Sequence, residues 1–357
     1  MRFGWILAAA ALAAAGCGST SDGNGSGGAG GNAGAAGSGG TGGTGGTAGS
    51  AGSGGSGGDG GTGGEIVIPT DEFDVGWTPE IPTDAIDAPM NEGERPGSCP
   101  SDRGFFSSVR GWVSAPGGKP LAGAKAQLCV YYGVDGYSCL SPVTTDEKGV
   151  YTIDVLPAMQ CFREAAMRVV RYDSNRATVY CPIPIGEGPA VRRYDPAVLP
   201  FALPAIDLPP VGDPDAPREV TFDDGLVMVA TPSLFEPVED WRTSYRDFSG
   251  RRIDVEAVGL CGDAATYDGL YAFYPEGKIA GAGYPLRIPN TNGYAAGTKV
   301  ELFVLGGLDC ELDGTKVPEA EWAKFGEGTV SDDEALIASD DGSGLPCTTW
   351  LGYRAKE

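Results

Sequence analysis

The chain of 357 residues contains no histidine. This absence excludes Ser-His-Asp and Cys-His catalysis, histidine-ligated zinc and any imidazole general base. Basic residues are also few, because 25 Lys and Arg stand against 48 Asp and Glu and give a net charge of −23. A nucleic-acid-binding surface needs a basic footprint, so this balance argues against a nucleic acid partner. Acidity of this kind more often keeps an exported protein soluble.

Long apolar runs are missing except at the start, where a short basic segment precedes the run Trp5 to Ala15. That run is too short for a permanent membrane span and is typical of a signal-peptide core. It ends in Ala14-Ala15-Gly16-Cys17, which resembles the bacterial lipobox, with alanine where leucine is commoner. The resemblance implies a lipoprotein signal peptide at 1–17, lipid attached to Cys17, and an anchor in the outer membrane or at the cell surface. The alternative is an ordinary cleaved signal with a chance cysteine.

The next two segments have little to bury. Residues 18–64 are almost wholly Gly, Ser, Thr and Ala, which predicts a disordered linker. Their G-x-S-x-G and G-x-G-x-x-G matches follow from composition and lack the flanking strand and helix that a catalytic elbow or a dinucleotide loop requires. Residues 65–98 are acidic, and their prolines predict a stiffer, extended spacer; these are Pro69, Pro79, Pro82, Pro89 and Pro96.

The clearest folded signal lies between Val109 and Val155. Residues 109–113, 124–130 and 151–155 alternate between apolar and other positions with a period of two, which predicts three strands. Turns are expected at 116–118 and 146–149, where Gly accepts the backbone conformation that a tight turn needs. The residues expected to point inward are Ala124, Ala126, Leu128 and Val130. In the other two strands, one shared face is expected to hold Val109, Gly111 and Val113, and the other Tyr151, Ile153 and Val155.

The same stretch resembles a known family. It contains, in order, V-x-G-x-V, G-K-P-L-A-G-A and T-x-D-x-x-G-x-Y-x-I. These motifs make residues 104–208 similar to the carboxypeptidase regulatory-like domain, which implies a transthyretin-type β-sandwich over 99–210. Some members of that family accompany a peptidase. No peptidase domain is recognisable in this chain, so the resemblance implies no peptidase activity.

A second β-rich domain is expected at 218–357, after a linker rich in Pro and Asp. Strands are indicated around a turn at 223–225 and at 270–274, 285–290 and 299–304. The segments DGLxMxxxPSLF, LYAFYPEG, PLRIPN and GTKVELF resemble ZU5-type sandwiches of surface and cytoskeletal proteins. The end of the chain is expected to form a meander of three strands. Long helical periodicity is absent, so the prediction is an all-β protein with two β-sandwich domains in tandem behind the linker.

Eight cysteines remain once Cys17 is set aside. An even number in an exported protein predicts disulfides. The candidates are Cys99, Cys129, Cys139, Cys161, Cys181, Cys261, Cys310 and Cys347. A hairpin turning at 133–136 places Cys129 nearly opposite Cys139, which makes them the first pair expected. Five of the eight lie in the first domain and three in the second, so either one bridge joins the domains or two thiols are free.

No catalytic, cofactor or metal site is expected. The acidic turn at 340–344 lacks the alternate-ligand spacing and the bidentate Glu of an EF-hand loop, so it is interpreted as a turn. Thr145 and Lys148 form a hydroxyl–lysine pair in sequence, but they lie in a hairpin turn rather than in a pocket. Carboxylate pairs for glycoside hydrolysis stay open, because acids are plentiful.

Three functions follow from these observations. The first is a lipid-anchored exported protein whose sandwiches have a non-catalytic structural or binding role. The second is a carbohydrate- or peptide-binding module, with an aromatic platform formed by Tyr271, Phe273, Tyr274, Tyr284 and Tyr294. The third is a carboxylate-based hydrolase. For Leu270–Tyr274 we expect packing rather than binding, since a strand that is apolar on both faces is usually covered on both.

Overall fold

The computed structural model describes residues 80, 82–90, 92–115, 118–132, 137–171, 176–183, 191–193, 197–198, 213–222, 224–238, 248–253 and 266–357. All of these residues belong to one compact unit, Gly63–Glu357. The unit is built almost entirely of strands, which confirms the all-β class. In the described part of the chain, no helix combines the length and the apolar character that crossing a membrane requires.

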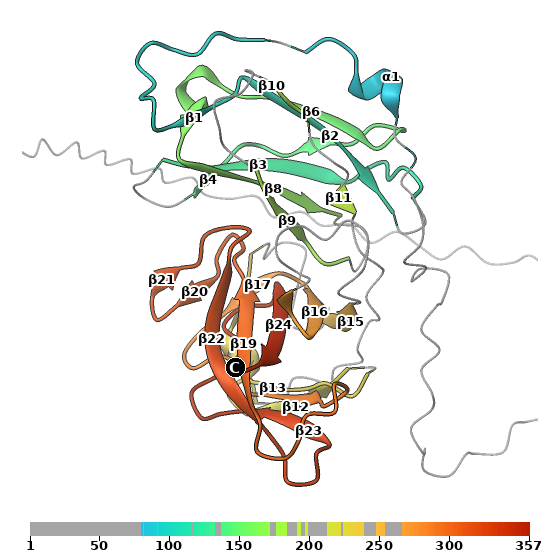
Figure 1. Cartoon of the computed structure of the whole chain (residues 1–357), viewed down its shortest axis with the longest axis vertical. Coiled ribbons are helices and arrows are strands. Elements are labelled where there is room, and N and C mark those ends of the chain that lie inside the picture. Colours follow the sequence, from blue (N-terminus) through green and yellow to red (C-terminus); the bar gives the residue numbers. More distant parts are fainter. Residues whose placement is uncertain are drawn as a thin grey trace, which may run out of the picture. The chain divides into compact units, whose positions relative to one another are not determined.

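The first set of strands, called the first module below, forms two facing sheets and one short two-stranded sheet made by its first and seventh strands (Figure 1). Its strands are β1 (Gly104–Phe105), β2 (Ser108–Ser114), β3 (Lys125–Tyr131), β4 (Tyr137–Cys139), β5 (Val143–Thr144), β6 (Val150–Asp154), β7 (Cys161–Phe162), β8 (Glu164–Val170), β9 (Val179–Pro182), β10 (Val191–Arg193) and β11 (Ala197–Val198). In one sheet β2 pairs antiparallel with β6 and parallel with β10 and β11. The other sheet has the order β4-β3-β8-β9, with β5 also on β3, and a 3-10 turn at Pro157–Met159 joins the two sheets.

The core of this module is the one that the sequence predicts. The four residues expected to point inward are buried and belong to a single apolar cluster. The same cluster contains the apolar residues of the two shared faces, which are Val109, Val113, Tyr151, Ile153 and Val155. The turn at 146–149 also forms as expected, because the Asp146 carboxylate accepts hydrogen bonds from the backbone N–H groups of Lys148 and Val150, both at 2.9 Å. Gly149 has φ 73°, and a Cβ there would lie 2.4 Å from the carbonyl oxygen of Val113. Only glycine fits this position without displacing β2.

The spacer expected at 65–98 is not free along its whole length. From Pro82 the chain folds onto β2, beginning with the helix α1 (Thr83–Ile86), whose Ile86 is buried against Trp112 and Val150. The guanidinium of Arg110 donates hydrogen bonds to four backbone carbonyl oxygens within residues 85–89, those of Ala85, Ile86, Ala88 and Pro89. We call residues 82–98 the strap. Since the strap covers the outer face of β2, that strand is buried on both faces.

The second module is built around a nine-stranded antiparallel sheet that curls on itself, in the order β12-β13-β18-β23-β22-β19-β24-β16-β15 (Figure 1). Its strands are β12 (Arg218–Thr221), β13 (Val227–Ala230), β14 (Phe235–Pro237), β15 (Ser249–Ile253), β16 (Gly269–Tyr274), β17 (Gly277–Ile279), β18 (Leu286–Pro289), β19 (Lys299–Leu305), β20 (Glu311–Leu312), β21 (Thr315–Lys316), β22 (Trp322–Val330), β23 (Leu336–Ser339) and β24 (Trp350–Ala355). A 3-10 turn at Pro232–Leu234 precedes β14, which pairs with β17, and β20 pairs with β21.

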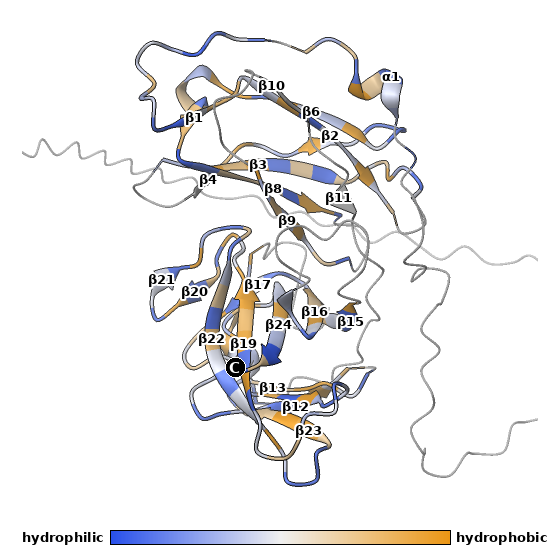
Figure 2. Cartoon of the chain, in the orientation of Figure 1, coloured by the Kyte–Doolittle hydropathy of each residue, from blue (hydrophilic) through white to orange (hydrophobic). Residues whose placement is uncertain are grey.

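A second apolar cluster lies inside the curl and draws on strands from both ends of the sheet. The apolar colouring of Figure 2 is strong along β19, which lies between β22 and β24 in the sheet order. A register shift between Leu302 and Phe303, opposite β22, marks a β-bulge. Bulges bend a strand and increase its twist, which is how a single long sheet closes around its own core.

The predicted pairing of the last strands is only half right. The strands β22 and β23 form the expected hairpin. The strand β24, however, does not continue the meander: it pairs with β19 on one side and β16 on the other. Both of its edges are therefore hydrogen-bonded, and Trp350, Leu351 and Tyr353 are all buried.

All seven described cysteines are disulfide-bonded. Cys129–Cys139 is present across the β3–β4 hairpin, where the sequence places this pair. Cys99–Cys161 joins the chain just after the strap to β7, and Cys310–Cys347 joins the β20–β21 hairpin to the segment before β24. Cys181 is also disulfide-bonded, whereas Cys17 and Cys261 lie outside the described residues.

Candidate functional site

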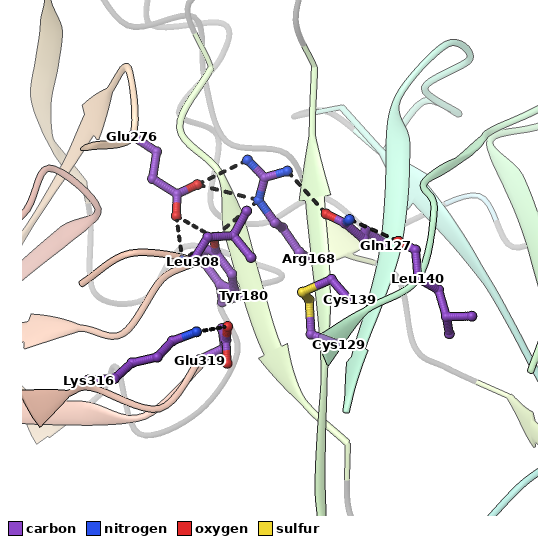
Figure 3. Close-up of a disulfide and its surroundings, with 10 residues drawn as sticks. All are labelled: Gln127, Cys129, Cys139, Leu140, Arg168, Tyr180, Glu276, Leu308, Lys316 and Glu319. Carbon is purple, nitrogen blue, oxygen red and sulfur yellow. Dashed lines mark hydrogen bonds and ion pairs between the residues drawn. A yellow bond between two sulfur atoms is a disulfide. The ribbon is translucent and has the colours of Figure 1, made fainter. Parts of the chain in front are cut away.

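The outer face of the β4-β3-β8-β9 sheet carries a buried charge. Arg168, in the middle of β8, is only 2% exposed. Its Nη2 lies 3.1 Å from the Oε2 of Glu276, which follows β16 in the second module (Figure 3). Its Nε donates to the Tyr180 hydroxyl at 3.1 Å and its Nη1 to the Gln127 side-chain oxygen at 3.3 Å. The guanidinium is thus held by partners from two strands, β3 and β9, and one loop.

The carboxylate of Glu276 is equally well bonded. Its Oε1 accepts hydrogen bonds from the Tyr180 hydroxyl and, at 2.9 Å, from the backbone N–H of Leu308. Burial and the nearby Glu276 charge raise the pKa of Tyr180 well above its usual value, so this hydroxyl stays protonated and donates. Both oxygens of Glu276 are occupied, so the Arg168–Tyr180–Glu276 group fastens β8 and β9 to the second module.

The apolar packing around this group is continuous. One cluster contains residues of the first module together with residues of the second, among them Leu270, Tyr274 and Trp350. The indole N–H of Trp350 also donates to the carbonyl oxygen of Thr178 at 2.7 Å. The two modules therefore share a core instead of being joined by a linker alone.

Glu319 is a second buried acid beside this group, at 1% exposure (Figure 3). Lys316 donates to its Oε1 at 2.9 Å, but its Oε2 is buried with no hydrogen-bond partner among the described residues. Burial raises the pKa of Glu319 to about 7, and the charge of Glu276 adds to the shift, whereas Lys316 opposes it. This side chain is therefore the described acid best placed to change charge near neutral pH.

A cavity of about 120 Å³ lies elsewhere in the second module, where four segments meet. These are the turn between β17 and β18, the β20–β21 hairpin, the start of β22 and the loop between β23 and β24. The lining residues are Ile279, Gly281, Ala282, Gly283, Glu311, Leu312, Asp313, Lys324, Phe325, Gly342, Gly344 and Pro346. The disulfide Cys310–Cys347 fixes the hairpin against the last of these segments.

The charged residues of the lining are not equivalent. Lys324 lies 2.9 Å from Glu301 and 2.7 Å from Glu327, and these contacts raise the pKa of its ammonium. Glu311 accepts a 2.5 Å ion pair from Lys278 through Oε2. Asp313 has no hydrogen-bond or ion-pair partner within the described residues. The ammonium of Lys324 is thus already paired, whereas the carboxylate of Asp313 is available to bind a ligand.

The aromatic residues proposed as a binding platform do not form one. Tyr271, Phe273, Tyr274 and Tyr284 are buried, and only Tyr294 is partly exposed. The Tyr271 hydroxyl donates to Asp224 at 2.5 Å and the Tyr284 hydroxyl to the Thr231 carbonyl at 2.7 Å. The expectation that Leu270–Tyr274 serves packing is confirmed, because every residue of β16 is buried.

The two turns considered for chemistry are structural. The Thr145 hydroxyl donates to the Leu121 carbonyl at 2.7 Å and accepts from the Ala124 N–H at 3.0 Å, so it closes the turn before β6. Asp340 accepts from Lys299 at 2.8 Å and from the Thr329 hydroxyl at 2.6 Å. Among the described residues, no group of three or more His, Cys, Asp or Glu is arranged to hold a metal ion.

Sequence reasoning missed the Arg168–Tyr180–Glu276 group and the cavity. A signal existed for the first, since Arg168 is a charge with two apolar residues on each side in the strand sequence EAAMRVV. Charges in such positions are usually paired when the strand is covered on both faces. No local signal pointed to the cavity, because its four segments are widely separated in sequence.

No protein-family model matches the chain, and no curated protein matches it. Among solved structures, the chain is similar to a 9R-lipoxygenase from Cyanothece PCC8801, with 16% sequence identity and a TM-score of 0.21. The similarity covers 38% of this chain and 21% of the lipoxygenase chain, so the match spans about a fifth of that enzyme's length. A likeness this low supports no statement about a shared fold or activity.

Proposed function

We propose that the protein is an exported, lipid-anchored protein whose two β modules form a non-catalytic head with a structural or binding role at the cell surface. The observation that carries the proposal is the oxidation state of the head. The disulfides Cys99–Cys161, Cys129–Cys139 and Cys310–Cys347 persist only in an oxidising compartment, which indicates an extracellular or periplasmic location. The lipobox-like segment ending in Cys17 supplies the anchor, and residues 18–64 supply its reach.

The build of the head supports a display role. The modules share a core and a buried ion pair, so the head is a rigid carrier, whereas its hairpins and turns are exposed. Surfaces presented by loops on a rigid scaffold are where binding residues concentrate.

The anchor is tested with Cys17→Ala and a matched Ser19→Ala control. In a detergent phase separation of cell membranes, the wild type and the control are expected in the detergent phase. The Cys17→Ala variant is expected in the aqueous phase, because it has lost the acyl chains that provide membrane affinity. If Cys17→Ala partitions into detergent as the wild type does, the anchor assignment is wrong.

The non-catalytic role is tested with a panel of chromogenic glycosides and esters. No turnover above the buffer rate is expected. Turnover that disappears on substitution of a single Asp or Glu, with the fold intact, would overturn the proposal in favour of a carboxylate-based hydrolase.

A binding role is favoured over a purely structural one by the cavity bounded by the β20–β21 hairpin. The glycan or peptide binding proposed from the sequence therefore moves from the aromatic strand to this cavity. A glycan array and a peptide array probed with the full exported protein would test it. Signals on either array that survive competition with excess unlabelled protein of unrelated sequence, but not with unlabelled wild type, support binding.

A further inference from the structure

Two walls of the cavity are formed by backbone segments that lie in direct contact with each other. A Cβ on Gly283 would lie 2.5 Å from the carbonyl oxygen of Gly344, and a Cβ on Gly344 would lie 2.3 Å from that of Ala282. The β17–β18 turn and the β23–β24 loop therefore touch through their main chains, with no side chain between them. Cys310–Cys347 fixes the third wall, the β20–β21 hairpin. Such a site needs little ordering when a ligand enters, which lowers the free-energy cost of binding.

The position of Asp313 is set by the hairpin turn. Asp313 has φ 50° and Gly314 has φ 74°, the left-handed pair of a two-residue β-hairpin turn between β20 and β21. The carboxylate at the cavity is therefore carried on a short, stapled turn and not on a long loop. With no partner of its own among the described residues, it remains free to accept hydrogen bonds from a ligand.

Charge and shape together define the ligand. Asp313 is joined by Glu311, whose Oε2 is bound to Lys278, and the ammonium of Lys324 is committed to Glu301 and Glu327. The available groups are thus acceptors, and the acids outnumber the bases around the cavity. Ile279, Leu312, Phe325 and Pro346 also border the cavity, but its accessible wall is mostly polar. A ligand that fits therefore needs a donor-rich cation on a short stem.

From this arrangement we propose that the cavity binds a protonated primary alkylamine, with its ammonium on the Asp313 and Glu311 carboxylates. The lysine side chain of a peptide and a free diamine both carry this group. The small volume of about 120 Å³ admits a side chain or a short diamine but not a folded partner. The inference rests on the proposed display role only in placing the amine outside the cell.

The test is calorimetric titration of the full exported protein with three probes: Nα-acetyl-lysine N-methylamide, 1,5-diaminopentane and glucose. Both amines are expected to bind, at an affinity that falls as salt is raised, and glucose is not. Binding of the lysine derivative alone assigns the site to peptides, and binding of the diamine alone assigns it to free amines. Failure of both amines at about 10 mM, a concentration above most weak dissociation constants, would overturn the inference.

Two variants locate the binding. Asp313→Asn removes the free charge with a residue that tolerates a positive φ, and Ala282→Trp fills the cavity from an exposed position. Each is expected to weaken amine binding by roughly tenfold or more, since a charge-assisted hydrogen bond or the site itself is lost. Asp332→Asn and Ala295→Trp, at exposed positions that do not line the cavity, are expected to bind as the wild type does.

Amine binding that is unchanged in both Asp313→Asn and Ala282→Trp would place the ligand elsewhere and refute the inference. The proposed display role would survive that result, since it is judged by the detergent partition of Cys17→Ala and by the arrays. Conversely, if Cys17→Ala still partitions into detergent, the anchor assignment is wrong but the prediction of amine binding in the cavity is unaffected. The two failures are therefore distinguishable.

Discussion

Two buried glutamates, Glu276 and Glu319, influence the stability of the head in opposite ways. Glu276 is compensated by a cation, a hydroxyl and a backbone N–H, whereas Glu319 has one lysine and one oxygen without a partner in the described chain. The same chemical group is therefore fully satisfied at one position and costly at the other. The contrast makes Glu319 the place where pH acts on stability.

Replacing Glu319 with Gln should make the protein more stable at pH 8 than the wild type. The pKa of Glu319 is raised from 4.5 to about 7 on folding, so the folded state holds a proton that the unfolded state releases. The stabilisation from this proton is complete below about pH 4.5, falls as pH rises and is lost above about pH 7. The difference in the free energy of unfolding between the wild type and Glu319→Gln should change by roughly 2–4 kcal/mol between these two pH values.

Urea denaturation of both proteins at several pH values measures this difference. The exposed Glu357→Gln serves as the control and should follow the wild type at every pH. Parallel pH profiles for Glu319→Gln and wild type would show that the acid is as well solvated in the folded state as in the unfolded one.

Truncation of Phe273 to Ala should destabilise the head by about 3–5 kcal/mol, the usual cost of removing a buried Phe. The ring is buried and meets that of Phe222 edge-on at 5.6 Å between centroids. Leu156→Ala is the matched control, since Leu156 is 59% exposed and should cost little. Thermal unfolding compares the two variants. An unchanged melting temperature for Phe273→Ala would show that Phe273 is not packed in the core.

Among the structural elements, the strap differs most from what its amino-acid composition predicts. Its prolines and acids are typical of a solvated spacer, yet α1 and the carbonyls that follow it are bound to β2 through Arg110. A single arginine thus satisfies backbone groups that would otherwise face an apolar strand. The strap in turn covers Trp112, which explains why β2 has no exposed face.

Limited proteolysis should therefore give a protected fragment that begins near residue 80, not near Ser98. In Arg110→Met, which keeps an unbranched apolar stem but removes the guanidinium donors, the cleavage sites should move to the segment before Cys99, where the disulfide to Cys161 holds the chain. Lys148→Met, at an exposed turn position, should leave the fragment unchanged. N-terminal sequencing of the fragments decides, and an identical start in all three proteins would mean that Arg110 does not hold the strap.

For the molecule as a whole, the Arg168–Glu276 pair joins the modules most directly. Breaking a buried ion pair from one side leaves an unpaired charge, which costs about 3–5 kcal/mol. Arg168→Met and Glu276→Gln should each be strongly destabilising. The double variant should lose clearly less than the sum of the two, because it leaves no uncompensated charge.

Chemical denaturation of the four proteins completes this double-mutant cycle. The Lys299–Asp340 pair, which is more exposed, provides the comparison cycle and should show a coupling below about 1 kcal/mol. Additive losses for Arg168 and Glu276 would show that the pair does not fasten the modules. Since the apolar cluster is shared, the wild type should unfold in one transition by both fluorescence and circular dichroism.

The sequence alone determined the features that depend on neighbouring residues. Alternation with a period of two identified the inward face of β3 and the residues that share a face in β2 and β6. The Asp, Lys and Gly residues identified the turn at 146–149. Hairpin geometry placed Cys129 opposite Cys139, and the apolar pattern on both faces of β16 predicted its burial. Each of these follows from interactions over a few residues, where backbone geometry leaves little choice.

The tertiary structure decided everything that depends on which distant surfaces meet. Nothing local indicates that β24 enters between β19 and β16, because strands with the same alternation fit several partners equally well. The pairing of Arg168 with Glu276 spans 108 positions, and the cavity collects side chains from four separate segments. A buried charge or a cavity is defined by what the rest of the chain brings to it, so its partners are fixed only when the sheets close and water is excluded.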